Sequence, residues 1–199
     1  MRKVIVCNIM SLDGYYDGPG GNVMVLPMDD AFDTYNLERI RHAGTVLLGR
    51  TSYEGFSSYW PHIADHPPQP ATNRAYNDTN RELSRIYNRL EKVVVTDSYA
   101  PAADNPWHAT TAVLARSDVG PWIGERRAER GGDILIYGSR TLWNSLLADH
   151  LVDELHLMVG AVGLGGGTPI FAGPVGGLTL REARRFDGSD NILLRYATA

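Results

Sequence analysis

The sequence contains a single cysteine, Cys7, which lies inside an apolar run near the N-terminus. One thiol cannot form an intramolecular disulfide, which fits a reducing compartment. We expect Cys7 to be a small buried side chain, because nothing in its surroundings marks it as a nucleophile. The chain has no stretch of about 18 apolar residues, so we expect no transmembrane helix. The start "MRKVIVCNIMSLDG" also lacks a long apolar region and an A-x-A cleavage site, so we expect a cytoplasmic protein.

No long block of one charge is present. The chain has 19 Lys and Arg residues against 23 Asp and Glu residues, for a formal net charge of −4. Binding to nucleic acid or to an anionic membrane usually needs a basic face, so neither partner is expected. The densest charged stretch, "GERRAERGG" at 124–132, interleaves acids with arginines and indicates a solvated helix face.

Several catalytic signatures are missing. The sequence has no G-x-G-x-x-G fingerprint, no G-K-[ST] phosphate loop and no G-x-S-x-G nucleophile elbow. His62 and His66 are four residues apart, but "HIADHPPQP" is rich in proline and has no E-x-x-H pattern. We therefore expect no metal site.

Strand-like and helical patterns alternate along the chain. The length of 199 residues and the 43% hydrophobic content suit one domain over 1–199. Apolar runs predict strands at 3–9, 45–49, 92–96, 110–115, 133–138 and 152–162, and helical spacing predicts helices at 28–44, 78–90, 117–130 and 139–151. Residues 51–60 form a short helix or a turn, and 178–198 an antiparallel β-hairpin. The predicted fold is α/β, with three layers and a mostly parallel twisted sheet covered on both faces.

The stretch "LLGRTSYEG" at 47–55 ends a buried strand with Gly49 and then presents Arg50, Thr51 and Ser52. Backbone N–H groups at a helix start favour an anion, and a guanidinium offers a fork of donors suited to phosphate. The two hydroxyl groups can bind the same anion or simply cap the helix. Taken alone, this stretch leaves both interpretations open.

Three further loops join this one at the predicted carboxyl ends of strands. In "LIYGSRTLWNSLL", Gly138 ends a strand and Ser139 opens a helix, and two such junctions in one sheet favour a phosphate-bearing cofactor. The glycines of "GLGGGTPIF" allow either a close approach to a ligand or a flexible crossover. The loop "SLDGYYDGPGGN", with the turn pair Asp13-Gly14, is either a lid or a plain surface loop.

Taken in order, these segments resemble the dihydrofolate reductase fold. The matching segments are "SLDG", "LLGRTSYEG", "KVVVT", "DILIYGSRTLWNSLL", "LVDELHLMVGAVGLGGGTPIF" and the closing hairpin. The likeness is greatest to the reductase domain of bacterial riboflavin biosynthesis, the RibD C-terminal domain family, and it covers nearly the whole chain. It implies an NADPH-dependent reductase that forms a homodimer. The Cys and His zinc ligands of the deaminase often fused to this domain are missing, which implies a stand-alone member.

The resemblance also assigns residues to the cofactor. It implies that NADPH contacts Gly49, Arg50, Thr51 and Ser52 at the first junction, Thr96 and Ser98 beside the adenine ribose, Gly138, Ser139, Arg140 and Thr141 at the second junction, and Gly165, Gly166 and Gly167 in the glycine-rich loop. Two positions depart from the family pattern. Ser52 stands where a threonine is usual, and Ser139 stands where dihydrofolate reductases have a second glycine.

The substrate end is less clearly marked. In dihydrofolate reductases an acidic residue follows a Leu-Pro-x pattern, and "LPMD" places Asp29 there. The resemblance implies that Asp29 is catalytic and, with Asp13, binds a pterin-like or pyrimidine-like substrate that accepts hydride at a C=N or C=O bond. Capping of the following helix is an equally open interpretation of Asp29. The alternatives for the whole chain are a non-catalytic nucleotide-binding protein of the same fold and a true dihydrofolate reductase.

Overall fold

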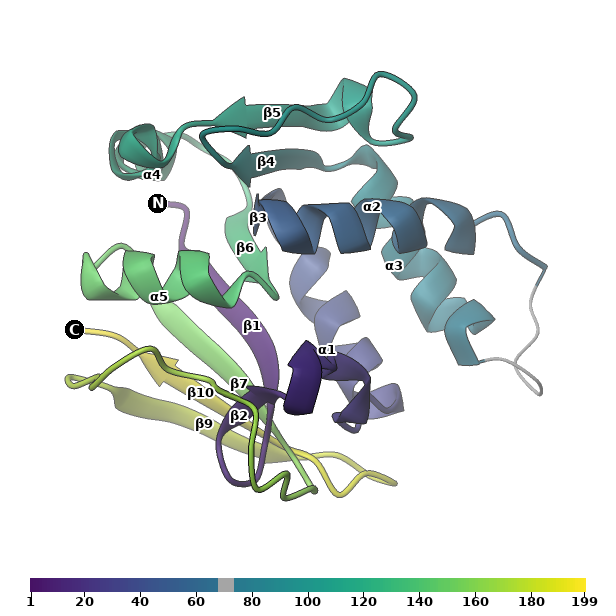
Figure 1. Ribbon diagram of the computed structural model, residues 1–199, viewed down its shortest axis with the longest axis vertical. Helices are drawn as coiled ribbons and strands as arrows, with labels where there is room; N and C mark the ends of the chain where they lie inside the picture. Colours follow the sequence, from purple (N-terminus) through teal and green to yellow (C-terminus); the bar gives the residue numbers. More distant parts are fainter. Residues whose placement is uncertain (68–73) are drawn as a thin grey trace. The chain divides into compact units, whose positions relative to one another are not determined.

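The computed structural model describes residues 1–67 and 74–199 (Figure 1). These residues form two compact units, which we describe separately. Unit 1 consists of residues 1–2 and 34–139, and unit 2 of residues 3–33 and 140–199. Helix α1 (Asp30–Ile40) contains the boundary between them. The single domain over 1–199 stays a prediction.

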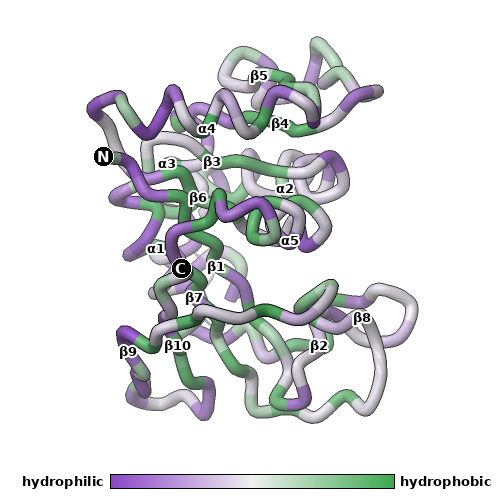
Figure 2. Tube along the Cα trace, turned by 90° about the vertical axis from the view of Figure 1, so that its left-hand side faces the viewer, coloured by the Kyte–Doolittle hydropathy of each residue, from purple (hydrophilic) through white to green (hydrophobic). Residues whose placement is uncertain are grey.

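Unit 1 contains four parallel strands in the order β5–β4–β3–β6. They are β3 (Ala43–Gly49), β4 (Glu91–Val95), β5 (Thr111–Leu114) and β6 (Asp133–Tyr137). The central runs of β3, β4 and β6 are buried, and Figure 2 colours them as hydrophobic. Continuous burial without alternation is typical of parallel strands covered on both faces. The register places Gly49 opposite Val95, and Val95 opposite Leu114, so these three strands end at one edge.

In its described residues, unit 1 contains the end of α1 and the whole helices α2 (Arg50–Ile63), α3 (Asp78–Arg89) and α4 (Val119–Ala128). Helix α2 is longer than the short helix or turn predicted at 51–60. Its serines and glycine are weak helix formers, but Tyr53, Ser57 and Pro61 recur every four residues and are buried. The Ser84 hydroxyl of α3 donates to the Trp60 carbonyl at the end of α2. Packing against α3 therefore sustains a helix that local propensity does not predict.

Strand β4 carries a buried lysine. Lys92 Nζ donates to the Tyr87 carbonyl at 2.7 Å and lies 4.7 Å from the centre of the Trp107 ring. The Trp107 indole N–H donates in turn to Asn88 Oδ1 at 2.7 Å. Burial disfavours the ammonium form and lowers the pKa of Lys92 from 10.5 to about 7.

We expect the free energy of unfolding to rise with pH between about 7.5 and 9.5 because of Lys92. Its folded pKa lies below its unfolded pKa, so the unfolded chain binds more protons in this window, and the slope is at most about 1.4 kcal/mol per pH unit. Urea unfolding at a series of pH values measures this slope. Lys92→Met is the control, and an identical slope in wild type and variant would contradict the assignment to Lys92.

Unit 2 is built on β1 (Val4–Ser11) and the parallel strand β7 (Glu154–Gly160). β10 (Ile192–Ala197) runs antiparallel to β7, and β9 (Thr179–Arg185) antiparallel to β10, which confirms the predicted hairpin. Helix α5 (Arg140–Ala148) also belongs to this unit. The loop predicted at 10–27 contains β2 (Tyr15–Asp17), which pairs with β8 (Thr168–Pro169), and short 3-10 turns at Pro19–Gly21 and Val23–Val25. The α/β class with mainly parallel strands and antiparallel C-terminal strands is confirmed.

An ionic cluster around the buried Glu154 and His156 joins the strands of unit 2. Glu154 Oε2 lies 2.7 Å from His156 Nε2 and 3.2 Å from the Arg195 guanidinium, and Lys3 donates to the other oxygen. The hydrogen bond from His156 does most to hold the pKa of Glu154 well below its ordinary range. Cys7 is buried, as predicted, with its Sγ 3.8 Å from His156 Nδ1. In the described ranges 1–67 and 74–199, no helix combines the length and the apolar character needed to span a membrane.

Candidate functional site

The first candidate site lies in unit 1, at the edge where its parallel strands end. Arg50 follows β3, Thr96 follows β4, Arg116 follows β5 and Gly138 follows β6. In open α/β sheets the crevice outside the carboxyl ends of the strands is where ligands bind. The predicted cofactor residues that belong to unit 1 therefore lie along one edge of its sheet.

A network of serine hydrogen bonds joins the two glycine junctions. The Ser139 N–H donates to Ser52 Oγ at 2.7 Å, and the Gly49 N–H donates to Ser139 Oγ at 3.0 Å. The Ser139 hydroxyl donates to the Tyr137 carbonyl at 3.0 Å. The Ser52 hydroxyl therefore connects β6 to α2. Since the residue at the N-cap of α2 is Gly49, no side chain caps this helix, and its first-turn N–H groups face the edge of the sheet.

The second junction places two consecutive residues, one of them a serine, in the left-handed region. Gly138 and Ser139 both have positive φ angles, of 56° and 52°. A left-handed conformation is uncommon outside glycine and is sustained only by its surroundings. Here the surroundings are the three hydrogen bonds of Ser139, whose side chain is buried.

Arg50 is half exposed at the start of α2. Its Nε donates to Glu54 Oε1 at 3.2 Å, and its guanidinium lies 5.1 Å from the centre of the Tyr99 ring. Tyr99 packs edge-on against Tyr53, so the loop after β4 supports the arginine from one side. Thr51 is exposed in the first turn of the helix. Both residues remain available to an anion at the helix N-terminus.

The loop after β4 is tied to the loop after β5. The Thr96 N–H donates to the Leu114 carbonyl at 2.9 Å, and Thr96 Oγ1 accepts from the Ser98 N–H at 3.4 Å. Between them, Asp97 accepts from the Arg116 N–H at 2.9 Å. Asp97 and Arg116 were not among the site residues predicted from the sequence. The signal was available, since "VLAR" at 113–116 repeats the strand-then-arginine pattern of "LLGR" at 47–50.

The remaining predicted cofactor residues belong to unit 2. Arg140 opens α5, and its guanidinium donates to the carbonyls of Pro169 and Phe171. Asn144, one turn later, donates to the Ile170 carbonyl at 3.1 Å and accepts from the Ala172 N–H at 2.7 Å. Thus Arg140 fixes the segment 169–172 of its own chain, while Thr141 is exposed in the first turn of the helix.

Asp13 holds the glycine-rich loop. Its carboxylate accepts from the backbone N–H groups of Leu164 and Gly165, the latter at 2.7 Å, and from the Ser11 hydroxyl at 2.6 Å. These hydrogen bonds, that from Ser11 first, lower the pKa of Asp13 to about 2. The predicted substrate role of Asp13 stays a prediction, and the structure assigns it a positioning role in its own unit.

The three glycines of this loop differ from one another. Gly165 and Gly167 have positive φ angles of 66° and 133°. A Cβ atom on Gly167 would lie 2.0 Å from the Asp17 carbonyl oxygen, whereas one on Gly166 would meet nothing within 4 Å. Because β2 approaches so closely, position 167 requires a glycine. The space beside Gly166 is open and has room for a ligand.

Asp29 caps helix α1. One carboxylate oxygen accepts from the Phe32 N–H at 3.1 Å, and the other accepts from the Ser189 hydroxyl. Asn191, which is buried, donates to the Pro27 carbonyl at 2.7 Å. The turn between β9 and β10 is thereby anchored to the "LPMD" segment. The capping interpretation of Asp29 describes this geometry, and its catalytic role stays a prediction.

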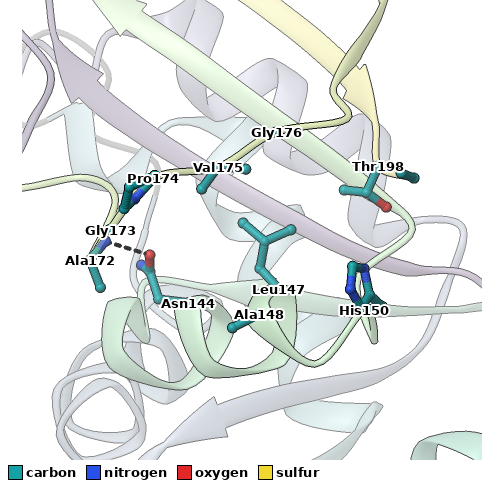
Figure 3. A pocket seen from close by; sticks show the side chains of 11 residues that line it. Asn144, Leu147, Ala148, His150, Ala172, Gly173, Pro174, Val175, Gly176 and Thr198 are labelled. Carbon is teal, nitrogen blue, oxygen red and sulfur yellow. Dashed lines mark hydrogen bonds between the residues drawn. The ribbon is translucent and has the colours of Figure 1, made fainter.

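A hollow of about 510 Å³ lies in unit 2 between α5, the segment 172–176 and the end of the chain (Figure 3). The side chains of Leu147, Ala148 and Val175 supply apolar surface, and Asn144 and His150 lie on the α5 side. Of the predicted site residues, none lines this hollow. Within residues 1–67 and 74–199, no cluster of three or more His, Cys, Asp or Glu side chains is arranged to hold a metal ion.

Comparison with known proteins agrees with this architecture. The family model of the RibD C-terminal domain matches residues 2–193. No curated protein sequence matches the chain. A crystal structure from Shewanella sp. PV-4, of a protein named for riboflavin biosynthesis, superposes with a TM-score of 0.67 at 16% identity and covers 99% of both chains.

Two enzymes share the fold at similar identity. The deaminase and 5-amino-6-(5-phosphoribosylamino)uracil reductase of Thermotoga maritima superposes with a TM-score of 0.66 at 15% identity, over 100% of this chain but only 57% of that one. The dihydrofolate reductase of Enterococcus faecalis, crystallised with NADP(H), superposes with a TM-score of 0.57 at 15% identity, over 98% of this chain and 95% of that one. With the family model spanning nearly all of its residues, the chain belongs to the RibD C-terminal domain family.

Proposed function

We propose that this protein is an NADPH-dependent reductase that transfers hydride to a small pterin-like or pyrimidine-like substrate. The observation that carries the proposal is the Ser52–Ser139 hydrogen bond at the edge of the unit 1 sheet. It joins the two glycine junctions beside the N-terminus of α2. Family membership supports a reductase. Two similar structures, one crystallised with NADP(H) and one named as a phosphoribosylaminouracil reductase, support the cofactor and the substrate class.

The donors at this edge fit a dinucleotide phosphate. The first turn of α2 supplies backbone N–H groups that no side chain caps, and Arg50 supplies a half-exposed guanidinium. Both are suited to anionic oxygens, and the positive end of the helix dipole adds to them. A bound nicotinamide cofactor would supply the hydride, and the chain's own task is binding, orientation and exclusion of water. Gly138 and Ser139 would contact it through a backbone already held in shape.

The proton that accompanies the hydride needs a donor, and Asp29 is the residue we propose for it. In this step the Asp29 carboxylate would take up a proton from water and pass it to a substrate nitrogen, while the Ser189 hydroxyl, which donates to the carboxylate, holds it in place. The second candidate function, a non-catalytic nucleotide-binding protein, rests on the same residues. Asp13 and Asp29 both direct their oxygens to partners in their own unit, and neither lines the hollow of Figure 3. We also propose a homodimer, in which β9, an end strand of the sheet in the described residues, offers its outer edge.

Nucleotide-dependent stabilisation tests the cofactor. At about 100 times its dissociation constant, a ligand adds roughly 2.7 kcal/mol to the free energy of unfolding, so NADPH should raise the melting temperature by several degrees. Arg50→Ala should remove most of the NADPH shift and little of the NADH shift, because we propose that the guanidinium binds the 2′-phosphate, which NADPH carries and NADH lacks. The measurement is thermal unfolding of both proteins without ligand, with NADH and with NADPH.

Arg85→Ala is the matched control, since Arg85 is an exposed arginine of α3 far along the chain from the junctions. No shift with either nucleotide would contradict the cofactor assignment. If NADPH and NADH raise the melting temperature equally, and Arg50→Ala changes neither increase, then Arg50 does not bind a phosphate of the nucleotide. Stabilisation by NADPH without its oxidation, across reduced-cofactor assays with pterins and aminopyrimidines, would favour the non-catalytic alternative.

A further inference from the structure

Three loops of unit 2 come together where β1 and β7 end, and one of them carries Asp29, the proposed proton donor. They are the loop after β1, the loop after β7 and the turn between β9 and β10, at residues 12–29, 161–170 and 186–191. The Leu12 N–H donates to the Val162 carbonyl at 2.8 Å, which joins the first two loops. The Asn191 amide donates to the Pro27 carbonyl at 2.7 Å, which joins the turn to the first loop. We call these three loops the substrate end of unit 2.

Carboxylates of the chain itself occupy backbone donors in the glycine-rich loop. Asp13 accepts from the N–H groups of Leu164 and Gly165. Asp17 Oδ1 accepts from the Thr168 N–H at 2.9 Å. Backbone N–H groups that point into a turn are the groups with which glycine-rich loops bind anions. Because these three donors are already satisfied by carboxylates, the loop does not offer them to a phosphate.

No basic side chain belongs to the two loops that follow β1 and β7. Residues 12–29 and 161–170 contain three aspartates and no lysine, arginine or histidine. The Arg140 guanidinium of α5 reaches the second loop, but it donates to the Pro169 and Phe171 carbonyls. A phosphate monoester is dianionic or nearly so at neutral pH. Brought against these loops, it would meet negative charge without a cation of the loops to offset it.

Two arginines stand directly before the turn 186–191, at the end of β9. Arg184 lies 4.8 Å from the centre of the Phe186 ring and 3.6 Å from Glu182 Oε1. Arg185 is exposed and lies opposite Ile192 of β10. Because β10 lies between β9 and β7, a full strand separates Arg185 from the strand that leads into the glycine-rich loop. Arg185 is therefore the cation on which a phosphate site at this end would depend.

Exposed apolar side chains gather at the substrate end instead. Within residues 1–67 and 74–199, eight large hydrophobic side chains are exposed. Half of them belong to these loops or directly follow one: Leu12 (71%), Met24 (77%), Val25 (39%) and Ile192 (41%). A ligand that covers them removes apolar surface from water, which favours binding. The substrate end thus suits an apolar group better than an anionic one.

We propose that the substrate is an uncharged pyrimidine-like compound whose ring carries a largely apolar substituent in place of a sugar phosphate. The inference rests on the proposed function, because it concerns the substrate of the same reductase. It separates this chain from the phosphoribosylaminouracil reductase that shares its fold. The loops oppose a phosphate by like charge, and Leu12 and Met24 favour the apolar substituent.

Three 5-aminouracils with the same ring and different 6-substituents test this proposal. The substituents are butylamino, ribosylamino and phosphoribosylamino, and calorimetry on the full chain with saturating NADP⁺ gives the dissociation constants. We expect the phosphate to weaken binding at least about ten-fold relative to the ribosyl compound. The butyl compound should bind about five-fold more tightly than the ribosyl compound, because its chain is apolar. The effect of the phosphate should shrink between about 0.02 and 0.5 M salt, since the repulsion is screened.

Met24→Lys adds a cation to the loop after β1 at an exposed position. It should tighten binding of the phosphoribosyl compound about five-fold, weaken the butyl compound about three-fold and leave the ribosyl compound unchanged. Ala148→Lys is the matched control, because it adds the same charge at an exposed position in the last turn of α5. We expect it to change none of the three dissociation constants.

The outcomes distinguish this inference from the proposed function. If the wild-type protein binds the phosphoribosyl compound as tightly as the ribosyl compound, the inference is wrong and the proposed function stands. Loss of that binding in Arg185→Gln would then assign the phosphate to Arg185. If NADPH stabilises the protein but none of the three compounds binds, the substrate class is wrong and the cofactor assignment stands. A protein that neither NADPH nor NADH stabilises would overturn the proposed function and this inference with it.

Discussion

Ser139→Val is expected to abolish nucleotide binding and to lower the free energy of unfolding by about 2 to 4 kcal/mol. Ser139 has a φ angle of 52°, a conformation that a β-branched side chain adopts only with strain of about 1 to 3 kcal/mol. The substitution also deprives the Gly49 N–H of its acceptor in a buried setting, at a cost of about 1 to 3 kcal/mol. The junctions after β6 and β3 would then be joined only by the hydrogen bond from the residue 139 N–H to Ser52 Oγ, and the nucleotide site depends on both junctions.

Two further variants separate the contributions to this loss. Ser139→Gly tolerates the positive φ angle and removes only the hydroxyl, so it should cost about 1 kcal/mol and retain weakened binding. Ser145→Val makes the same change at an exposed position of α5 and should be almost neutral. Urea unfolding and calorimetry with NADPH measure both properties. Wild-type stability in Ser139→Val would show that the left-handed conformation is not required.

The predictions from sequence succeeded where the signal was local. The strand at β3 is an unbroken apolar run, and the closing hairpin has polar turn residues between two strands, so both were predicted. The length of α2 was not predicted, because Ser, Gly and Pro argue against a helix and only its buried stripe against α3 explains it. Tertiary packing is not visible in local propensity.

For the candidate functional site, too, local features could be predicted from sequence and long-range contacts could not. The glycine junctions were recognisable from strand-then-glycine spacing and from their order along the chain. The partners of Ser52 and Asp13 were not, since Ser139 and Gly165 lie 87 and 152 residues away in sequence. A serine before a helix is most often a cap, and sequence alone does not indicate that Ser52 accepts a hydrogen bond from another junction. Arg116 was overlooked because the polar residues after it suggested only a helix start.

Gly167→Ala is expected to lower the free energy of unfolding by about 3 kcal/mol or more, as the most severe single substitutions do. The φ angle of 133° suits glycine almost alone, and the new methyl group would lie 2.0 Å from the Asp17 carbonyl oxygen. The backbone at Asp17 cannot shift easily to relieve this contact, because the Asp17 carboxylate also accepts a hydrogen bond from the Thr168 N–H at 2.9 Å. The pairing of β2 with β8 should therefore break, and the glycine-rich loop should lose its position.

Gly166→Ala makes the matched comparison one residue away, where an added Cβ meets nothing within 4 Å. It should leave stability within about 0.5 kcal/mol of wild type, because a surface change without strain or lost contacts has little effect. Hydrogen exchange should be faster at residues 12–18 and 163–171 in Gly167→Ala but not in Gly166→Ala. If NADPH affinity falls in Gly166→Ala while its stability and exchange are unchanged, the open space at Gly166 belongs to the cofactor. Equal stability losses in the two variants would contradict the steric requirement that we assign to Gly167.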